Sequence, residues 1–169
     1  MKKNLAVIVM GAKSDYDHAA RIIEWLDYFG IAHETRIASA HKTPEKLLGL
    51  LEAQEKKDDN VAYITIAGLS NALSGMVDFA TAFPVIACPP PCDSFGGADI
   101  FSSLRMPPGV AAATVLDPRN AAFFVAKLFA VGDETLKAAI NAYHEEQRTK
   151  IDRDEAALNT DSGKEGTSR

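Results

Sequence analysis

One short segment, ASAHKTP at residues 38–44, places a histidine among small, polar and cationic residues, an arrangement found nowhere else in the chain. Imidazole titrates near neutral pH, so His41 could act there as a general acid or base. The neighbouring Lys42 could supply a positive charge to a phosphate or a carboxylate. A plainer interpretation is that Thr43 caps a helix while His41 and Lys42 are only solvated.

A second polar segment, GAKSD at residues 11–15, follows the first apolar run. Gly11 permits a tight turn, and Ser14 and Asp15 stand where a helix should begin. Backbone N–H groups at a helix start bind phosphate, and an aspartate can accept hydrogen bonds from ribose hydroxyls. The pattern fits a nucleotide site, although capping by Ser14 or Asp15 explains it equally well.

The third polar segment, AGLSNALSG at residues 67–75, holds two glycines, two serines and an asparagine. It has no aspartate at the place where a response regulator is phosphorylated, and it lacks the GxxxxGK[ST] pattern of a P-loop. Either it is a binding loop, or it is a glycine-rich turn followed by an Asn or Ser cap.

A long proline-rich segment, CPPPCDSFGGADIFSSLRMPPG at residues 88–109, follows the fourth apolar run. Consecutive prolines favour a stiff, extended chain, and we expect one helix in the remainder. The segment could cover a site or pack against another subunit. Asp93 and Arg105 could accordingly contact a ligand or form an ion pair between subunits.

Apolar runs and helical stripes alternate along the chain, which is typical of strands and helices taken in turn. We predict strands at residues 5–11, 32–39, 61–68, 84–91 and 110–116. We predict helices at residues 15–29, from 43, within 71–81, from 118, and from 133 to about 158. The alternation predicts an α/β fold, a flavodoxin-like three-layer α/β/α sandwich with a central parallel sheet. Ligands of such sheets bind at the carboxyl ends of the strands, where the polar segments lie.

Length and composition favour one globular domain. The 169 residues suit a single catalytic domain with its C-terminal helix at residues 1–158, followed by a disordered tail at 159–169 that lacks apolar residues. The net charge of −5 disfavours a nucleic-acid surface. No apolar run reaches the roughly 20 residues that a membrane-spanning helix needs. The apolar start of the chain fits a buried strand better than a signal peptide, so we expect a cytoplasmic protein.

The cysteines and the other histidines suggest no further site. Cys88 and Cys92 are spaced unlike any metal motif, so we expect buried free thiols and no metal. We expect His18 and His33 to be packed or solvated.

Taken together and in order, the polar segments resemble the motifs of the phosphoribosylaminoimidazole carboxylase family of de novo purine synthesis. GAKSD resembles the family's GSxSD, and SAHKTP resembles its SAH[RK]TP. The segments AGLSNALSGMVDFATAFPVIACPPP and SSLRMPPGVAAATVL, followed by NAA, lie in the family's order. The resemblance spans about residues 6–130, and several ordered motifs are far more specific than any one of them.

The family has two branches that make the same product, 4-carboxy-5-aminoimidazole ribonucleotide. One is a mutase that moves a carboxylate from N5 of carboxyaminoimidazole ribonucleotide to carbon 4, and the other adds CO2 directly to aminoimidazole ribonucleotide without ATP. The mutase branch typically has arginine after the motif histidine, and a second histidine in the loop after the third strand. Lys42 and the histidine-free loop at residues 67–75 resemble the direct carboxylase branch.

Two positions depart from the family's pattern. Ala12 stands where GSxSD has serine, and Leu69 stands where the carboxylase branch has arginine in AGRSN. The change to Ala12 leaves a backbone N–H available to a ligand. The change to Leu69 removes a fixed charge and a forked donor, so it is expected to affect substrate binding or the shape of the loop.

The resemblance implies a mechanism and a set of site residues. His41 would remove the proton from carbon 4 after attack on CO2, and Lys42 would stabilise the new carboxylate or the 5′-phosphate. The ribonucleotide and CO2 would be the partners, with no cofactor and no metal, and the protein would be a homo-oligomer, commonly an octamer. The residues implied in substrate binding are Gly11, Ala12, Ser14, Asp15, Ser39, Lys42, Gly68, Ser70 and Asn71.

Two functions of other classes remain as alternatives. One is a non-catalytic nucleotide-binding or flavin-binding module, although GAKSD is poorer in Ser and Thr than the turn of flavodoxin-type FMN sites. The other is a purely structural oligomerisation domain, which leaves the polar segments unexplained.

Overall fold

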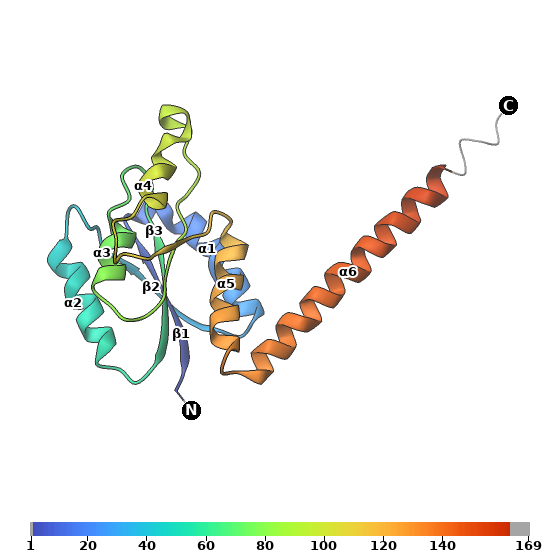
Figure 1. Cartoon of the computed structure of the whole chain (residues 1–169), viewed down its shortest axis with the longest axis horizontal. Helices are drawn as coiled ribbons and strands as arrows, with labels where there is room; N and C mark the ends of the chain where they lie inside the picture. Colours follow the sequence, from blue (N-terminus) through green and yellow to red (C-terminus); the bar gives the residue numbers. More distant parts are fainter. Residues whose placement is uncertain (1, 163–169) are drawn as a thin grey trace. The chain divides into compact units, whose positions relative to one another are not determined.

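The computed structural model describes residues 2–162 and contains a five-stranded parallel sheet with the strand order β2-β1-β3-β4-β5 (Figure 1). Each strand runs parallel to its neighbours. This order is that of flavodoxin-like proteins, so the predicted fold class is confirmed. The strands are β1 (Asn4–Met10), β2 (Ala32–Ile37), β3 (Asn60–Ile66), β4 (Val85–Ala87) and β5 (Ala113–Thr114).

Helices cover both faces of the sheet and complete the three predicted layers (Figure 1). On one face lie α1 (Tyr16–Tyr28) and α5 (Pro118–Ala130). The rings of Phe29 and Phe123 meet there edge to face, with their centroids 5.0 Å apart. On the other face lie α2 (Pro44–Glu55) and α3 (Leu73–Phe79). The remaining helices are η1 (Lys13–Asp15), η2 (Ser94–Ile100), α4 (Phe101–Leu104) and α6 (Glu134–Ser162).

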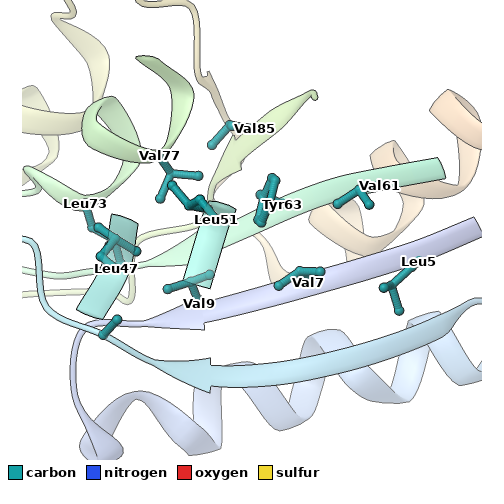
Figure 2. Close-up of a cluster of buried hydrophobic side chains, with 11 residues drawn as sticks. Leu5, Val7, Val9, Leu47, Leu51, Val61, Tyr63, Leu73, Val77 and Val85 are labelled. Carbon is teal, nitrogen blue, oxygen red and sulfur yellow. The ribbon is translucent and has the colours of Figure 1, made fainter. Parts of the chain in front are cut away.

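A buried apolar core lies between the sheet and the helices α2 and α3 (Figure 2). β1 and β3 contribute alternate residues to it, because successive side chains of a strand point to opposite faces. α2 and α3 contribute residues four positions apart, because these share one side of a helix. The core consists of Leu5, Val7, Val9, Ala38, Leu47, Leu51, Val61, Tyr63, Leu73, Val77 and Val85.

Local signals begin and end several helices where the sequence predicts. Gly30 ends α1 in a left-handed conformation with φ of 66°. Asp117 Oδ1 accepts a hydrogen bond from the backbone N–H of Asn120 at 3.0 Å. Asp133 Oδ1 accepts one from the backbone N–H of Leu136, also at 3.0 Å. The two aspartates therefore cap α5 and α6.

The last two strands are shorter than predicted. We expected strands at residues 84–91 and 110–116, whereas pairing is confined to Val85–Ala87 and Ala113–Thr114. Residues 89–91 are prolines, which have no N–H to donate to a neighbouring strand. Since β4 ends before them, β5 pairs only with Ile86 and Ala87. The chain after β4 therefore leaves the sheet early.

The chain divides by compactness into two units, Met1–Phe129 and Ala130–Arg169. The second unit contains α6, which runs to Ser162, so residues 159–162 are helical although we expected disorder there. Ion pairs one turn apart, such as Arg148–Glu145 at 2.9 Å, support this polar helix. Residues 163–169 of the expected tail lie outside the described residues, and the single domain at residues 1–158 stays a prediction. None of the helices described is both long and apolar enough to cross a membrane.

The core between α2 and the sheet predicts that shortening two leucines of α2 changes the free energy of unfolding by very different amounts. Leu51 is 1% exposed, whereas Leu48 is 39% exposed. We expect Leu51→Ala to lower the free energy of unfolding by about 2–5 kcal/mol, because it leaves a cavity that the core cannot fill. The matched control, Leu48→Ala, should cost less than about 1 kcal/mol in the same urea titration. Equal costs would contradict the described packing of α2.

Candidate active site

A cleft of about 460 Å³ lies at the carboxyl ends of the strands, where the strand order reverses between β1 and β3. The loops after β1, β2 and β3 all contribute to it, so the three polar segments meet in one place. The predicted site residues that line the cleft are Gly11, Ala12, Ser14, Asp15, Ser39, His41, Lys42, Gly68 and Ser70.

The loop after β1 is folded back on itself by Asp15. Its Oδ2 accepts a hydrogen bond from the backbone N–H of Ala12 at 3.0 Å. The side chain of Asp15 makes no hydrogen bond that caps α1, but its bond to Ala12, the N-cap residue of η1, caps the start of that short helix, so a capping role for Asp15 is present one helix earlier. The N–H of Ala12, which we expected to be available to a ligand, is already used by Asp15.

The loop after β2 is closed by hydrogen bonds between Ser39 and Thr43. Thr43 Oγ1 accepts from the backbone N–H of Ser39 at 3.0 Å and donates to the Ser39 carbonyl oxygen at 3.3 Å. Ser39 Oγ accepts from the backbone N–H of Lys42 at 3.2 Å. Thr43 occupies the N-cap position of α2, but its side chain makes no capping hydrogen bond. Its hydroxyl therefore shapes the loop that carries His41 and Lys42.

His41 and Lys42 are exposed and line the cleft. Among the salt bridges within the described residues, none involves Lys42. An accessible imidazole beside an accessible ammonium can exchange a proton with an anionic molecule and bind its charge. This pair can therefore carry out general acid–base chemistry on such a molecule.

The loop after β3 comes close to the proline segment. A Cβ atom at Gly68 would lie 3.4 Å from Pro90 Cγ, which is close to an ordinary van der Waals contact, so the loop lies directly beside the proline ring. Leu69 has a left-handed backbone with φ of 57°, which is uncommon for a residue with a side chain. Its side chain is 67% exposed and lines the cleft. An apolar group therefore stands where the carboxylase motif has arginine.

Asn71 is the predicted ligand that the structure places elsewhere. Its side chain is 5% exposed and does not line the cleft. Its Nδ2 donates to Ser74 Oγ at 2.7 Å and to Ser103 Oγ at 2.9 Å. Its Oδ1 accepts from the backbone N–H of Ser74 at 3.1 Å. Both ends of the amide are therefore engaged inside the protein, which its position in the sequence did not reveal.

A second cavity of about 290 Å³ adjoins the cleft and shares Ala67, Gly68 and Leu69 with it. Most of its remaining walls belong to the proline-rich segment at residues 88–109, for which the sequence suggested that it could cover a site, although no single wall residue was predicted. Asp93 and Arg105 are exposed and line neither cavity, so both roles considered for them stay open. The remaining walls are Pro89, Pro90, Pro91, Cys92, Gly97, Asp99, Ile100, Ser103 and Leu116.

Cys88 and His18 form a buried pair, with Cys88 Sγ 3.4 Å from His18 Nε2. Burial raises the pKa of Cys88 to about 12. Burial, together with the charge of Arg21, lowers the pKa of His18. Both groups are neutral at neutral pH, so Cys88 is not an activated nucleophile.

Cys92 and His33 also lie apart from the cleft lining. Cys92 is a free, half-buried thiol whose Sγ lies 3.1 Å from Asp99 Oδ2, so full burial is confirmed only for Cys88. His33 Nε2 lies 3.0 Å from Asp27 Oδ1. In the part of the chain that the structure describes, no three His, Cys, Asp or Glu residues are grouped as metal ligands.

Comparison with known proteins assigns the chain to a family. A sequence model described as AIR carboxylase matches residues 5–150. The chain belongs to the AIR carboxylase family. A phosphoribosylaminoimidazole carboxylase from Archaeoglobus fulgidus is 54% identical over 146 residues, covering 86% of this chain and 80% of that protein. The resemblance recognised from the motifs is therefore confirmed.

The chain is also similar to a solved structure and to a relative that is named for the mutase reaction. The crystal structure of Treponema denticola PurE matches with a TM-score of 0.90 at 48% identity, covering 91% of this chain and 98% of that one. An N5-carboxyaminoimidazole ribonucleotide mutase from Methanocaldococcus jannaschii is 38% identical over 146 residues, covering 85% of this chain and 90% of that protein. Relatives named for both reactions therefore share this chain's sequence pattern.

The buried His18–Cys88 pair predicts a dependence of stability on pH. Because the pKa of His18 is lowered on folding, its contribution is fully present above the unfolded value of 6.5 and is lost as the pH falls towards the folded value. Urea titrations of the wild type and of His18→Asn between pH 7.5 and pH 5 test this. The variant should lose less stability than the wild type over this range, and an equal loss in both would contradict the assignment.

Proposed function

We propose that this AIR carboxylase family member adds CO2 to carbon 4 of 5-aminoimidazole ribonucleotide, giving 4-carboxy-5-aminoimidazole ribonucleotide in purine biosynthesis without ATP. The observation that carries the proposal is the meeting of three polar loops in one cleft, with His41 and Lys42 exposed on its wall. A non-catalytic binding module would not need an accessible acid–base group there.

The direct carboxylase reaction is favoured over the mutase reaction by two features. The loop at residues 67–75 contains no histidine, and lysine rather than arginine follows His41. Two relatives named carboxylase are 54% and 48% identical to this chain, whereas one named mutase is 38% identical and the relatives named bifunctional carboxylases are 36–38% identical. The mutase reaction, which makes the same product, remains the alternative.

The loops after β1 and β2 would hold the ribose and the phosphate. Ser14 and Ser39 bring hydroxyl groups to the cleft, and Lys42 brings a positive charge. Asp15 already binds the N–H of Ala12 through Oδ2, so its Oδ1 is the oxygen that would accept from a ribose hydroxyl. The closed turn between Ser39 and Thr43 fixes the direction from which Lys42 approaches the ribonucleotide.

The reaction itself needs a base and a pocket that receives an apolar electrophile. The exocyclic amine of the substrate pushes electron density onto carbon 4, which attacks the carbon of CO2 and forms the new C–C bond. The electron pair of one C–O π bond of CO2 moves onto its oxygen and gives the new carboxylate its negative charge. Carbon 4 still carries its proton, which must then be removed. His41 takes that proton, which restores the aromatic imidazole, and it returns the proton in the reverse direction. Lys42 stabilises the new carboxylate or the 5′-phosphate.

The loop after β3 would close over the imidazole ring and CO2. Gly68 and Ser70 line the cleft, and Gly68 also borders the second cavity. Apolar side chains from the prolines at residues 89–91, Ile100 and Leu116 make up much of the wall of that cavity, beside the polar residues Asp99 and Ser103. Such a surface suits CO2, which is small and has no net charge.

We also propose a homo-oligomer, of which an octamer is the form that the motif resemblance implies, and a cytoplasmic location. Large apolar side chains are exposed on the segment after β4: Phe95 is 87%, Phe101 66% and Leu104 57% exposed. Several exposed apolar groups in one short segment are typical of a surface that another chain covers.

Replacing His41 tests both the reaction and the assigned base. Turnover is measured as product formed from aminoimidazole ribonucleotide and dissolved CO2 without ATP. We expect His41→Asn to lower kcat by about 10²–10⁴, because the proton on carbon 4 then has no positioned acceptor. KM for the ribonucleotide should change less than about threefold, since His41 acts on the proton rather than on binding.

The matched control is His33→Asn, which makes the same substitution at a histidine paired with Asp27 outside the cleft. It should keep the wild-type kcat. A wild-type protein without turnover would contradict the proposed reaction, whereas an active His41→Asn variant would contradict only the assignment of the base.

A further inference from the structure

The loop Gly68–Ser70 forms part of the cleft, and its position therefore matters for any molecule held there. Gly68 and Leu69 line both the cleft and the second cavity, and Ser70 lines the cleft. A displacement of this loop would change both cavities at once.

Ser102 of α4 joins this loop to the segment after β4. Its Oγ accepts a hydrogen bond from the backbone N–H of Asn71 at 3.0 Å. The same Oγ lies 3.1 Å from the Leu69 carbonyl oxygen and 2.7 Å from that of Asp99, and its single proton is donated to one of the two. One hydroxyl thus contacts the loop on both sides of Ser70.

The side chain of Asn71 anchors the same loop to the core. It donates to Ser103 Oγ of α4 at 2.9 Å and to Ser74 Oγ of α3 at 2.7 Å. Ser74 Oγ lies 2.8 Å from Thr65 Oγ1 of β3, and both of these hydroxyl groups belong to fully buried residues. A continuous set of hydrogen bonds therefore connects β3, α3, the loop and α4.

The backbone conformation of Leu69 indicates that surrounding contacts hold the loop in its position. A left-handed conformation is unfavourable for leucine and persists only where the surroundings impose it. The backbone contacts on either side of this strained stretch, at the Leu69 carbonyl and the Asn71 N–H, both end on Ser102. Removing that hydroxyl should let the loop relax.

We propose that Asn71, Ser102 and Ser103 form a clasp that positions the loop Gly68–Ser70 for carboxylation. Asn71 and Ser102 are positioning residues in this proposal, and they act on the substrate only through the loop. The proposal rests on the function proposed above, since it assigns the loop a role in the same reaction. It also gives the buried amide of Asn71 a function other than binding the ribonucleotide.

The variant Ser102→Ala tests the clasp with two readouts. Hydrogen–deuterium exchange of the full chain should show the Asn71 amide exchanging roughly tenfold faster, because its acceptor is gone. The carboxylation assay should show kcat falling about tenfold while KM for the ribonucleotide changes less than about threefold, because a displaced loop impairs the geometry of reaction more than binding. Ser102→Thr keeps the hydroxyl and should restore both values.

Matched variants separate the clasp from a general loss of stability. Ser94→Ala alters an exposed serine of η2 outside the clasp and should leave both readouts unchanged. Ser103→Ala removes the second link and should act in the same direction as Ser102→Ala. Unchanged exchange, or unchanged kcat, in Ser102→Ala would overturn the proposal while the wild type remained active. A wild type without carboxylation would instead overturn the proposed function, and the role of the clasp with it.

Discussion

The final backbone hydrogen bonds between neighbouring strands determine where the cleft lies. Gly11 N donates to the Ile66 carbonyl oxygen at 2.9 Å, which is the last link between β1 and β3. Ala38 N donates to the Met10 carbonyl oxygen at 3.0 Å, which is the last link between β2 and β1. Beyond these links the sheet no longer pairs the backbone, so each chain turns away and presents polar side chains. The cleft therefore owes its position to the parallel register of three strands.

Much of this arrangement could be predicted because it depends on local sequence and on one rule of parallel sheets. The apolar run of β1, the helix caps at Asp117 and Asp133 and the left-handed Gly30 are all readable from neighbouring residues. The convergence of the three polar segments follows from the common direction of the strands. They suffice for the fold class and for the polar residues that line the cleft, whereas Asn71, which was also predicted, does not line it.

The features that could not be predicted depend on contacts between distant segments. The amide of Asn71 is buried because Ser103, which is 32 positions further along the chain, reaches it. The second cavity is lined by the prolines at residues 89–91, which follow the early end of β4, and by Leu116, which is far from them in the sequence. The hydrogen bond from the Ala12 N–H to Asp15 joins residues only three positions apart. A comparison of motifs considers each position by itself, so it does not reveal this bond. Residue type alone therefore indicated which loops matter, and only the structure showed which atoms remain available to a ligand.

Leu69 shows how the family's architecture tolerates a change in its own motif. Its backbone carbonyl oxygen and the N–H of Asn71 both contact Ser102, and Leu69 itself is exposed. The loop can therefore keep its course without the arginine of the motif. What the change removes is a charge near the cleft, which leaves Lys42 as the cation that lines it.

In direct carboxylation, the carboxyl carbon of the product comes from dissolved CO2. The most direct measurement supplies the enzyme with unlabelled N5-carboxyaminoimidazole ribonucleotide in an excess of ¹³C-labelled bicarbonate and CO2, and follows the label by mass spectrometry. A direct carboxylase can use this substrate only after it has lost its own CO2, so the product should carry ¹³C at the carboxyl carbon. An unlabelled product formed at the full enzymatic rate would show that the carboxylate is transferred from N5, and it would rule out direct carboxylation.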